Sequence, residues 1–296
     1  MHSKNPGYLS ANNSFKHLLS LSMLVSICLL LMTACKNNKP APPIAYGKNE
    51  QVGKYADING IKLYYEIYGE GEPLVLIHGN GGSIASGREQ IAYFSKNYKV
   101  IALDSRGQGR SKDESDSLTY DAMAADVNGL LNELKIDSAY VIGQSDGAII
   151  GLITAFRYPA KVKKLAAMAP NIRPDSAVLY PKVEAEGAIQ FAKYEDSLKA
   201  GFKTVLGRVK LLRLMQYHPH ISTAELASIK APVMIMCGDR DVIRLSHIIE
   251  IFRAIPNANL CVLPASTHTA LRKNPLVFNE TIERFFSKPF SMPDSY

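Results

Sequence analysis

The sequence predicts an α/β fold: a mostly parallel, doubly wound sheet with an inserted helical lid. Short apolar runs alternate with helical segments in residues 54–170 and again in residues 223–290. Strands that alternate with helices favour a parallel sheet covered on both faces. Between these two parts, residues 171–222 are helical in character and contain no buried-strand run. We therefore expect this segment to form a lid over the carboxyl ends of the strands, where open α/β sheets bind ligands.

Each element is predicted from its own local pattern. Residues 55–58 and 61–68 form two alternating runs around an Asn-Gly pair, which predicts a hairpin. Residues 119–134 carry an apolar stripe at helical spacing behind Thr119, a suitable N-cap. The remaining patterns predict strands at 73–77, 98–103, 139–142, 165–168, 233–237 and 260–263, and helices at 146–158 and 275–286.

A serine lies between two glycines where the predicted strand at 139–142 gives way to a helix. The sequence there is Gly143-Gln144-Ser145-Asp146-Gly147, which is the G-x-S-x-G pattern of a nucleophile elbow. Such a turn holds the serine in a strained backbone conformation, so that its hydroxyl projects from the end of the sheet. The glycines let the strand and the helix approach closely. Ser145 is therefore the candidate nucleophile.

A serine hydroxyl becomes a good nucleophile only when a base takes its proton and an acid orients that base. On folds with this elbow, the acid and then the histidine follow the serine along the chain. Gly238-Asp239-Arg240-Asp241 follows a predicted strand and offers two candidate acids, and His268 follows the last predicted strand. Because these groups all lie at the carboxyl ends of strands, we expect Ser145, His268 and one of the aspartates to meet.

The same chemistry needs donors for the negative oxygen of the tetrahedral intermediate. One donor is the backbone N–H after the nucleophile, which belongs to Asp146. The other should come from the loop after the strand that ends at His78. We choose Asn80 there and then Gly81, because small residues let the backbone approach a substrate. Gly81 is also a tentative substrate-binding residue.

Together these motifs resemble the α/β-hydrolase fold-1 family over residues 56–288. The matching segments are His78 to Gly82, Asp104 to Ser111, the elbow, Gly238 to Asp241, and His268 ahead of Asn274-Pro275. Within the family, the elbow and the run to Pro170 look closest to valacyclovir-hydrolase-like (biphenyl-hydrolase-like) serine esterases. The resemblance implies the α/β-hydrolase fold and assigns the acid to Asp241 rather than Asp239. Haloalkane dehalogenases and epoxide hydrolases in the family use an aspartate at the elbow, so Ser145 argues against both.

The motifs and the resemblance predict a serine hydrolase that cleaves carboxylic esters of small to medium substrates through an acyl-enzyme. Amide or C–C bond hydrolysis by the same triad, and ligand binding without catalysis on the same scaffold, remain alternatives. Asp146 is unusual, because an apolar residue often follows the serine in such esterases. Its carboxylate would either pair with a substrate ammonium, as in aminoacyl esters, or bond to nearby backbone or lid groups. No cofactor is expected, and no residue spacing suggests a metal site.

The N-terminal region predicts export and attachment to a membrane. Two lysines precede an apolar segment, residues 18–32, that is short for a membrane span, and small residues precede Cys35. This resembles a bacterial lipoprotein signal in which residues 1–34 are removed and Cys35 carries the lipid; an uncleaved anchor is the alternative. Residues 35–53 predict a disordered tether, because their polar, proline-rich start cannot bury a core. We expect the protein in the bacterial cell envelope, lipid-anchored to a membrane and facing the periplasm or the surface.

The charge of the chain bears on its binding partners, and its cysteines bear on disulfide formation. The net charge of +7 falls to +5 in the mature part, because the leader contains two lysines and no acidic residue. No dense basic block with interleaved aromatic residues is present, so nucleic acid is not an expected partner. Cys237 and Cys261 lie in apolar runs and are expected to be buried thiols, with a disulfide between them left open.

Overall fold

The structure of the protein is a computed structural model that describes Met1 and residues 44–291. Residues from Ala45 onward form one compact unit. Residues 2–43 lie outside the described residues, and with them the predicted leader, the predicted lipid-attachment site Cys35 and the first part of the predicted tether. Within the described part of the chain, no helix combines the length and the hydropathy needed to cross a bilayer.

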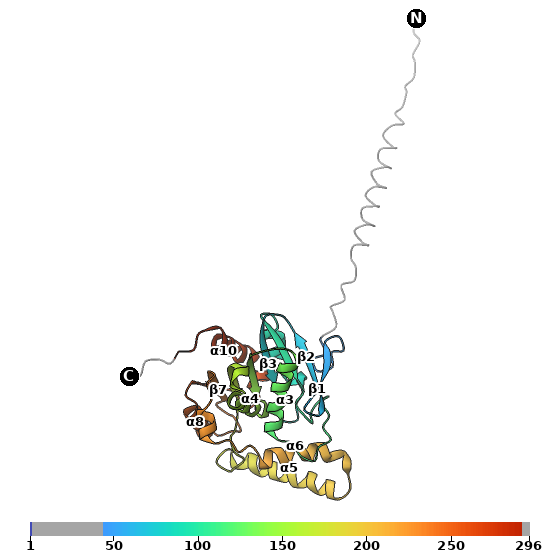
Figure 1. The fold of residues 1–296 in the computed structure, drawn as a ribbon, viewed down its shortest axis with the longest axis vertical. Coiled ribbons are helices and arrows are strands. Elements are labelled where there is room, and N and C mark those ends of the chain that lie inside the picture. The colour runs from blue at the N-terminus through green and yellow to red at the C-terminus, as the bar shows by residue number, and fades with distance from the viewer. Residues whose placement is uncertain (2–43, 292–296) are drawn as a thin grey trace, which may run out of the picture. The chain divides into compact units, whose positions relative to one another are not determined.

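Eight strands form a single sheet in the order β1-β2-β4-β3-β5-β6-β7-β8 (Figure 1). β2 is antiparallel to β1 and to β4, and all other neighbouring strands are parallel. The predicted hairpin and the predicted mostly parallel sheet are therefore confirmed. The strands are β1 (Gly53–Ile58), β2 (Ile61–Tyr68), β3 (Glu72–Ile77), β4 (Tyr98–Leu103), β5 (Ala139–Gln144), β6 (Val162–Met168), β7 (Val233–Gly238) and β8 (Ala258–Leu263).

Helices pack in pairs around the sheet: α3 contacts α4, and α2 contacts α10. The Thr119 hydroxyl caps α3 as predicted, accepting a hydrogen bond from the Ala122 backbone N–H at 3.2 Å. The helices are α2 (Arg88–Phe94), α3 (Tyr120–Glu133), α4 (Asp146–Arg157), α5 (Pro181–Lys199), α6 (Leu206–Tyr217), α7 (Thr223–Ala227), α8 (Leu245–Ala254), α9 (Ala270–Lys273) and α10 (Pro275–Ser287). The sequence did not predict α2, which has only seven residues and so presents too few turns for a clear apolar stripe.

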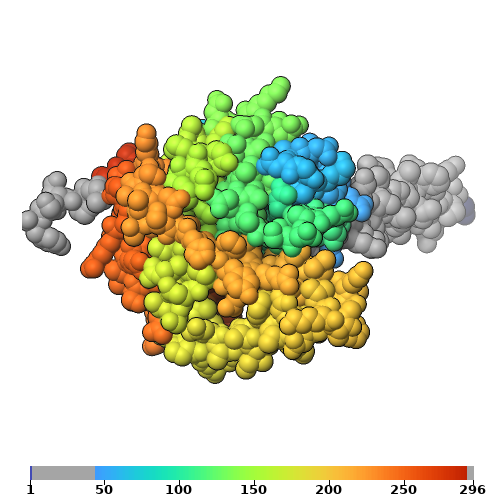
Figure 2. Space-filling model, turned by 60° about the horizontal axis from the view of Figure 1, so that its bottom comes forward, coloured from blue at the N-terminus to red at the C-terminus, as the bar shows by residue number. Residues whose placement is uncertain are grey.

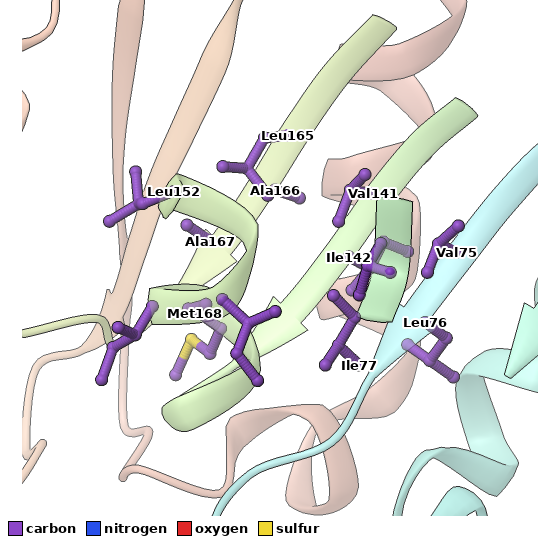
Figure 3. Close-up of a cluster of buried hydrophobic side chains, with 14 of the residues drawn as sticks. Val75, Leu76, Ile77, Val141, Ile142, Leu152, Leu165, Ala166, Ala167 and Met168 are labelled. Carbon is purple, nitrogen blue, oxygen red and sulfur yellow. The ribbon is translucent and has the colours of Figure 1, made fainter. Parts of the chain in front are cut away.

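Directly beneath the elbow lies a dense apolar core. The inner strands β3, β5 and β6 carry small and branched side chains on both faces of the sheet, several of which are labelled in Figure 3. Val141 and Leu165 face α4 beside Gly151, whereas their neighbours Ile142 and Ala166 point to the opposite face. These residues are almost completely removed from water. Strands buried on both faces explain why their sequences are continuous apolar runs rather than alternating ones. This packing gives the turn between β5 and α4 a rigid base.

Helices α5 and α6 form the predicted lid as an antiparallel pair set apart from the helices that cover the sheet (Figure 1). In the space-filling view their yellow and light-orange residues form one side of the molecule (Figure 2). α5 buries no residue, whereas α6 buries Val209, Leu212 and Leu214 among others. A hydrogen bond from Asn80 Nδ2 to the Leu211 carbonyl, at 3.3 Å, ties α6 to the loop after β3. The lid therefore rests on the body through α6.

The predicted disordered tether, residues 35–53, ends earlier than expected. Gly47 N–H and Asn49 N–H donate to the carboxylate of Glu66, which is fully buried in β2, at 2.7 and 3.0 Å. The Tyr64 and Tyr68 hydroxyls donate to the same carboxylate, each at 2.7 Å. Four donors satisfy this buried charge and hold residues 45–52 on the core.

Candidate active site

The elbow holds Ser145 in a backbone conformation that residues with a side chain rarely adopt, with φ 54° and ψ −117°. Glycine is required on both sides of Gln144-Ser145-Asp146, because other backbone segments approach these two positions closely. A Cβ at Gly143 would lie 2.2 Å from the Gly147 carbonyl oxygen, and one at Gly147 would lie 2.2 Å from the Ile77 carbonyl oxygen. Strain at this turn is maintained by the packed strands around it, a feature typical of functional sites.

The structure brings His268 and Asp241 together. Asp241 lies in the turn after β7, and its Oδ1 is 2.7 Å from His268 Nδ1, in the loop after β8. The Asp241 side chain is 1% exposed and also accepts hydrogen bonds from the Gly238 and Ile243 N–H groups. Asp239 instead accepts from the Ser266 N–H at 3.0 Å. Of the two candidate acids, only Asp241 contacts the histidine.

A cavity of about 260 Å³ lies between the elbow and the lid. Ser145, Asp146 and His268 all line it, which places these three predicted residues at one site. No hydrogen bond joins Ser145 Oγ to His268 among the residues that the structure describes. Such contacts are often long in structures without substrate and tighten in the complex. The rest of the wall comes mainly from the lid and from the segment after β6, including Val178, Val183, Phe191, Leu212 and Met215.

Asp146 is a buried carboxylate held by two neutral donors. Asn80 Nδ2 donates to its Oδ2 at 2.9 Å, and the Tyr120 hydroxyl donates to its Oδ1 at 3.0 Å. Burial raises the pKa of Asp146 to about 6, although these hydrogen bonds and the nearby His268 oppose the shift. Burial and the adjacent carboxylate raise the pKa of Tyr120 well above its ordinary value. The contacts are those of a carboxylate bonded to neighbouring groups, one of the two alternatives for Asp146.

The loop after β3 approaches the site through Asn80. Its side chain bridges Asp146 and the lid carbonyl of Leu211, although Asn80 is not among the cavity-lining residues. Gly81 is exposed and does not line the cavity either, and its N–H donates to the buried Gln108 Oε1 at 2.7 Å. The Gly81 N–H is therefore engaged by the protein itself. The structure does not bring Gly81 to the other predicted site residues.

Sequence reasoning missed three residues that shape the site. Tyr120 supports Asp146 from the first turn of α3. Gln144, directly before the serine, donates from Nε2 to the His268 carbonyl at 3.3 Å and so connects the elbow to the histidine loop. Arg173 lines the cavity and pairs with Glu250 through two hydrogen bonds, at 2.6 and 2.8 Å. No local pattern marks these residues, because each acts through a partner far away in the chain.

The segment after β6 is fastened by a buried histidine, His247. This histidine lies in α8, with its side chain turned into the protein. Its Nε2 accepts from the Ile172 N–H at 3.2 Å, and its Nδ1 lies 3.1 Å from Glu250. Burial lowers the pKa of His247, which favours the neutral ring that this acceptor role requires. Within the described residues, no three His, Cys, Asp or Glu side chains are grouped to hold a metal ion.

Comparison with known proteins gives consistent matches. Residues 72–220 match the family described as alpha/beta hydrolase fold. "Putative carbamate hydrolase RutD" of Azorhizobium caulinodans is 26% identical over 262 residues, covering 78% of this chain and 97% of that protein. The human serine hydrolase BPHL is 25% identical over 283 residues, covering 86% and 94%.

A solved structure shows the same fold at lower identity. The enol-lactonase from Burkholderia xenovorans LB400 superimposes with a TM-score of 0.66 at 23% identity, covering 79% of this chain and 100% of that one. The sheet order, the elbow between β5 and α4, and the inserted helices agree with the family match. The chain belongs to the alpha/beta hydrolase fold family and is a hydrolase.

Proposed function

We propose that this hydrolase cleaves carboxylic esters of small to medium substrates through an acyl-enzyme on Ser145. One observation carries the proposal: Ser145 and His268 open into the same lid-covered cavity, while His268 Nδ1 lies 2.7 Å from the buried Asp241. With its Nδ1 proton donated to Asp241, His268 presents Nε2 as the base that takes the serine proton. The serine oxygen attacks the ester carbonyl, the alcohol leaves with a proton from His268, and water then releases the acid.

Two backbone N–H groups are proposed to stabilise the tetrahedral oxyanion. Asp146 is the first residue of α4, so its N–H has no acceptor within the helix. Asn80 supplies the second N–H, and its side-chain bond to Asp146 holds the loop against the elbow. The Gly81 N–H is less suited, since Gln108 already accepts from it. Preorganised donors of this kind supply a large part of the rate enhancement in acyl transfer.

The test uses the full chain and a Ser145→Ala variant. We expect p-nitrophenyl esters to be hydrolysed by the wild-type chain, and the variant to lose turnover and labelling by a fluorophosphonate. Amide, carbamate and C–C substrates belong in the same panel, because the triad also serves those bonds and one relative is named as a carbamate hydrolase. A folded wild-type chain with neither turnover nor labelling would favour a non-catalytic binding protein.

We also propose the second alternative for Asp146, that its carboxylate recognises an ammonium group of the substrate. The carboxylate lines the cavity and has no cationic side chain among its hydrogen-bond donors, which are Asn80 and Tyr120. A carboxylate accepts more than two hydrogen bonds, so a ligand ammonium would still find room. Unchanged selectivity between aminoacyl and plain acyl esters in Asp146→Ala would rule this role out.

We also propose that Cys35 carries a lipid that anchors the protein in the bacterial cell envelope. The support is the sequence alone: an apolar leader followed by small residues and a cysteine. Cells expressing the wild-type chain should incorporate labelled fatty acid into it and retain it in the membrane fraction. Cys35→Ala should lose the label, and a variant that kept it would contradict the assignment.

A further inference from the structure

Gly187 occupies an unusual place in the lid. It lies in the interior of α5, a 19-residue helix, where glycine is destabilising relative to alanine. Its φ does not lie in the left-handed region that favours glycine. No atom lies within 4 Å of the position that a Cβ would take. Neither local conformation nor close packing therefore requires glycine here.

The helix geometry directs that empty position toward the cavity. Six residues of α5 line the cavity: Val183, Glu184, Gly187, Ala188, Gln190 and Phe191. At about 100° per residue, they span an arc of about 160° around the helix axis. Gly187 lies near the middle of that arc, about 40° from Val183 on one side and about 40° from Phe191 on the other. A side chain at this position would project into the cavity roof.

We infer that Gly187 is a specificity-determining residue: its missing side chain leaves room beneath α5 for a bulky apolar group of the substrate. The nearest lining residues match that chemistry: Val183 and Phe191 flank the bare position, and Leu212 and Met215 of α6 continue the wall. Glu184 and Gln190 add polar groups to the same arc of α5. This inference rests on the proposed ester hydrolysis and adds the size of the substrate group to it. Small esters do not need the space, whereas long-chain or aryl esters do.

Graded variants of the full chain test the inference. Gly187→Leu should lower the ratio of kcat/KM for p-nitrophenyl octanoate over that for the acetate by about tenfold or more, because pocket size discriminates at this level. Activity on the acetate should fall much less than activity on the octanoate, because a small ester does not need the space beneath α5. Gly187→Ala should change the ratio less and raise the Tm by about 2–4 °C through its higher helix propensity.

Gly207 offers a matched control. It lies in α6, also has no atom within 4 Å of the position that a Cβ would take, and does not line the cavity. Gly207→Leu should leave the octanoate-to-acetate ratio unchanged. The inference would be overturned if Gly187→Leu left the octanoate-to-acetate ratio unchanged, or if Gly207→Leu lowered that ratio equally. In either case, turnover that depends on Ser145 would still support ester hydrolysis. A wild-type chain that hydrolysed neither ester would overturn both.

Discussion

Replacing Asp146 by asparagine removes a buried negative charge and keeps the shape of the side chain. The asparagine oxygen still accepts from the Tyr120 hydroxyl. Rotation of the Asn80 amide gives the new NH2 group an acceptor, at the loss of the 3.3 Å bond from Asn80 to the Leu211 carbonyl. The substitution therefore changes charge more than packing. We expect Asp146→Asn to stabilise the protein at neutral pH.

The magnitude follows from the pKa of the carboxyl. Burial raises the pKa of Asp146 from 3.8 to about 6. At about 1.36 kcal/mol for each tenfold change in acidity, this higher pKa corresponds to a penalty of about 3 kcal/mol for ionising Asp146 in the native state. Between about pH 4 and pH 6, the native state keeps a proton on Asp146 that the unfolded chain has released. The contribution of this group to the free energy of unfolding is therefore highest below that window and falls as the pH rises through it.

Urea unfolding of both chains over this pH range measures the effect. Between about pH 4 and pH 7.5, the difference in the free energy of unfolding should shift by about 3 kcal/mol in favour of Asp146→Asn. Carboxyl groups common to both chains cancel in this difference. A difference that stayed constant with pH would refute the reasoning, since it would mean that the native state does not disfavour the charge.

Asp239→Asn is the control with the opposite sign. Hydrogen bonds from the Ser266 and Ala265 backbone lower the pKa of the exposed Asp239, so its charge favours the native state. This variant should lose stability at neutral pH, and the loss should shrink as the pH falls below the ordinary range of aspartate titration.

Two further substitutions test the site and its support. Asp241→Asn should lower kcat by up to about four orders of magnitude, because an amide does not hold His268 in the required tautomer, whereas Asp239→Asn should stay within about tenfold of wild type. Steady-state hydrolysis of p-nitrophenyl acetate compares them, and equal losses would contradict the choice of Asp241. Glu66→Ala should lower the free energy of unfolding by about 3 kcal/mol or more, because several buried donors lose their acceptor, while Glu66→Gln should lose less. Urea unfolding checks this, and a loss below about 1 kcal/mol for Glu66→Ala would show that residues 45–52 hold to the core without it.

The sequence by itself determined the architecture and the candidate nucleophile. Periodicity located the hairpin, the strands and the helices α3, α4 and α10, because burial on one or both faces produces a recognisable local pattern of apolar residues. The elbow was visible because its chemistry is contained within five adjacent residues, from Gly143 to Gly147. Chain order then placed His268 and an aspartate at the ends of later strands.

Only the tertiary structure decided how distant residues meet. The residues alone left Asp239 and Asp241 open, and the fold turns Asp241 toward His268 and Asp239 toward Ser266. The partners of Asp146 lie 26 and 66 residues away along the chain, so no local pattern reveals them. The same holds for Gly187, whose importance arises from the cavity that α5 covers. Local propensity depends on neighbouring residues in the chain, whereas burial, pKa and cavity shape depend on contacts between segments that are distant in the sequence.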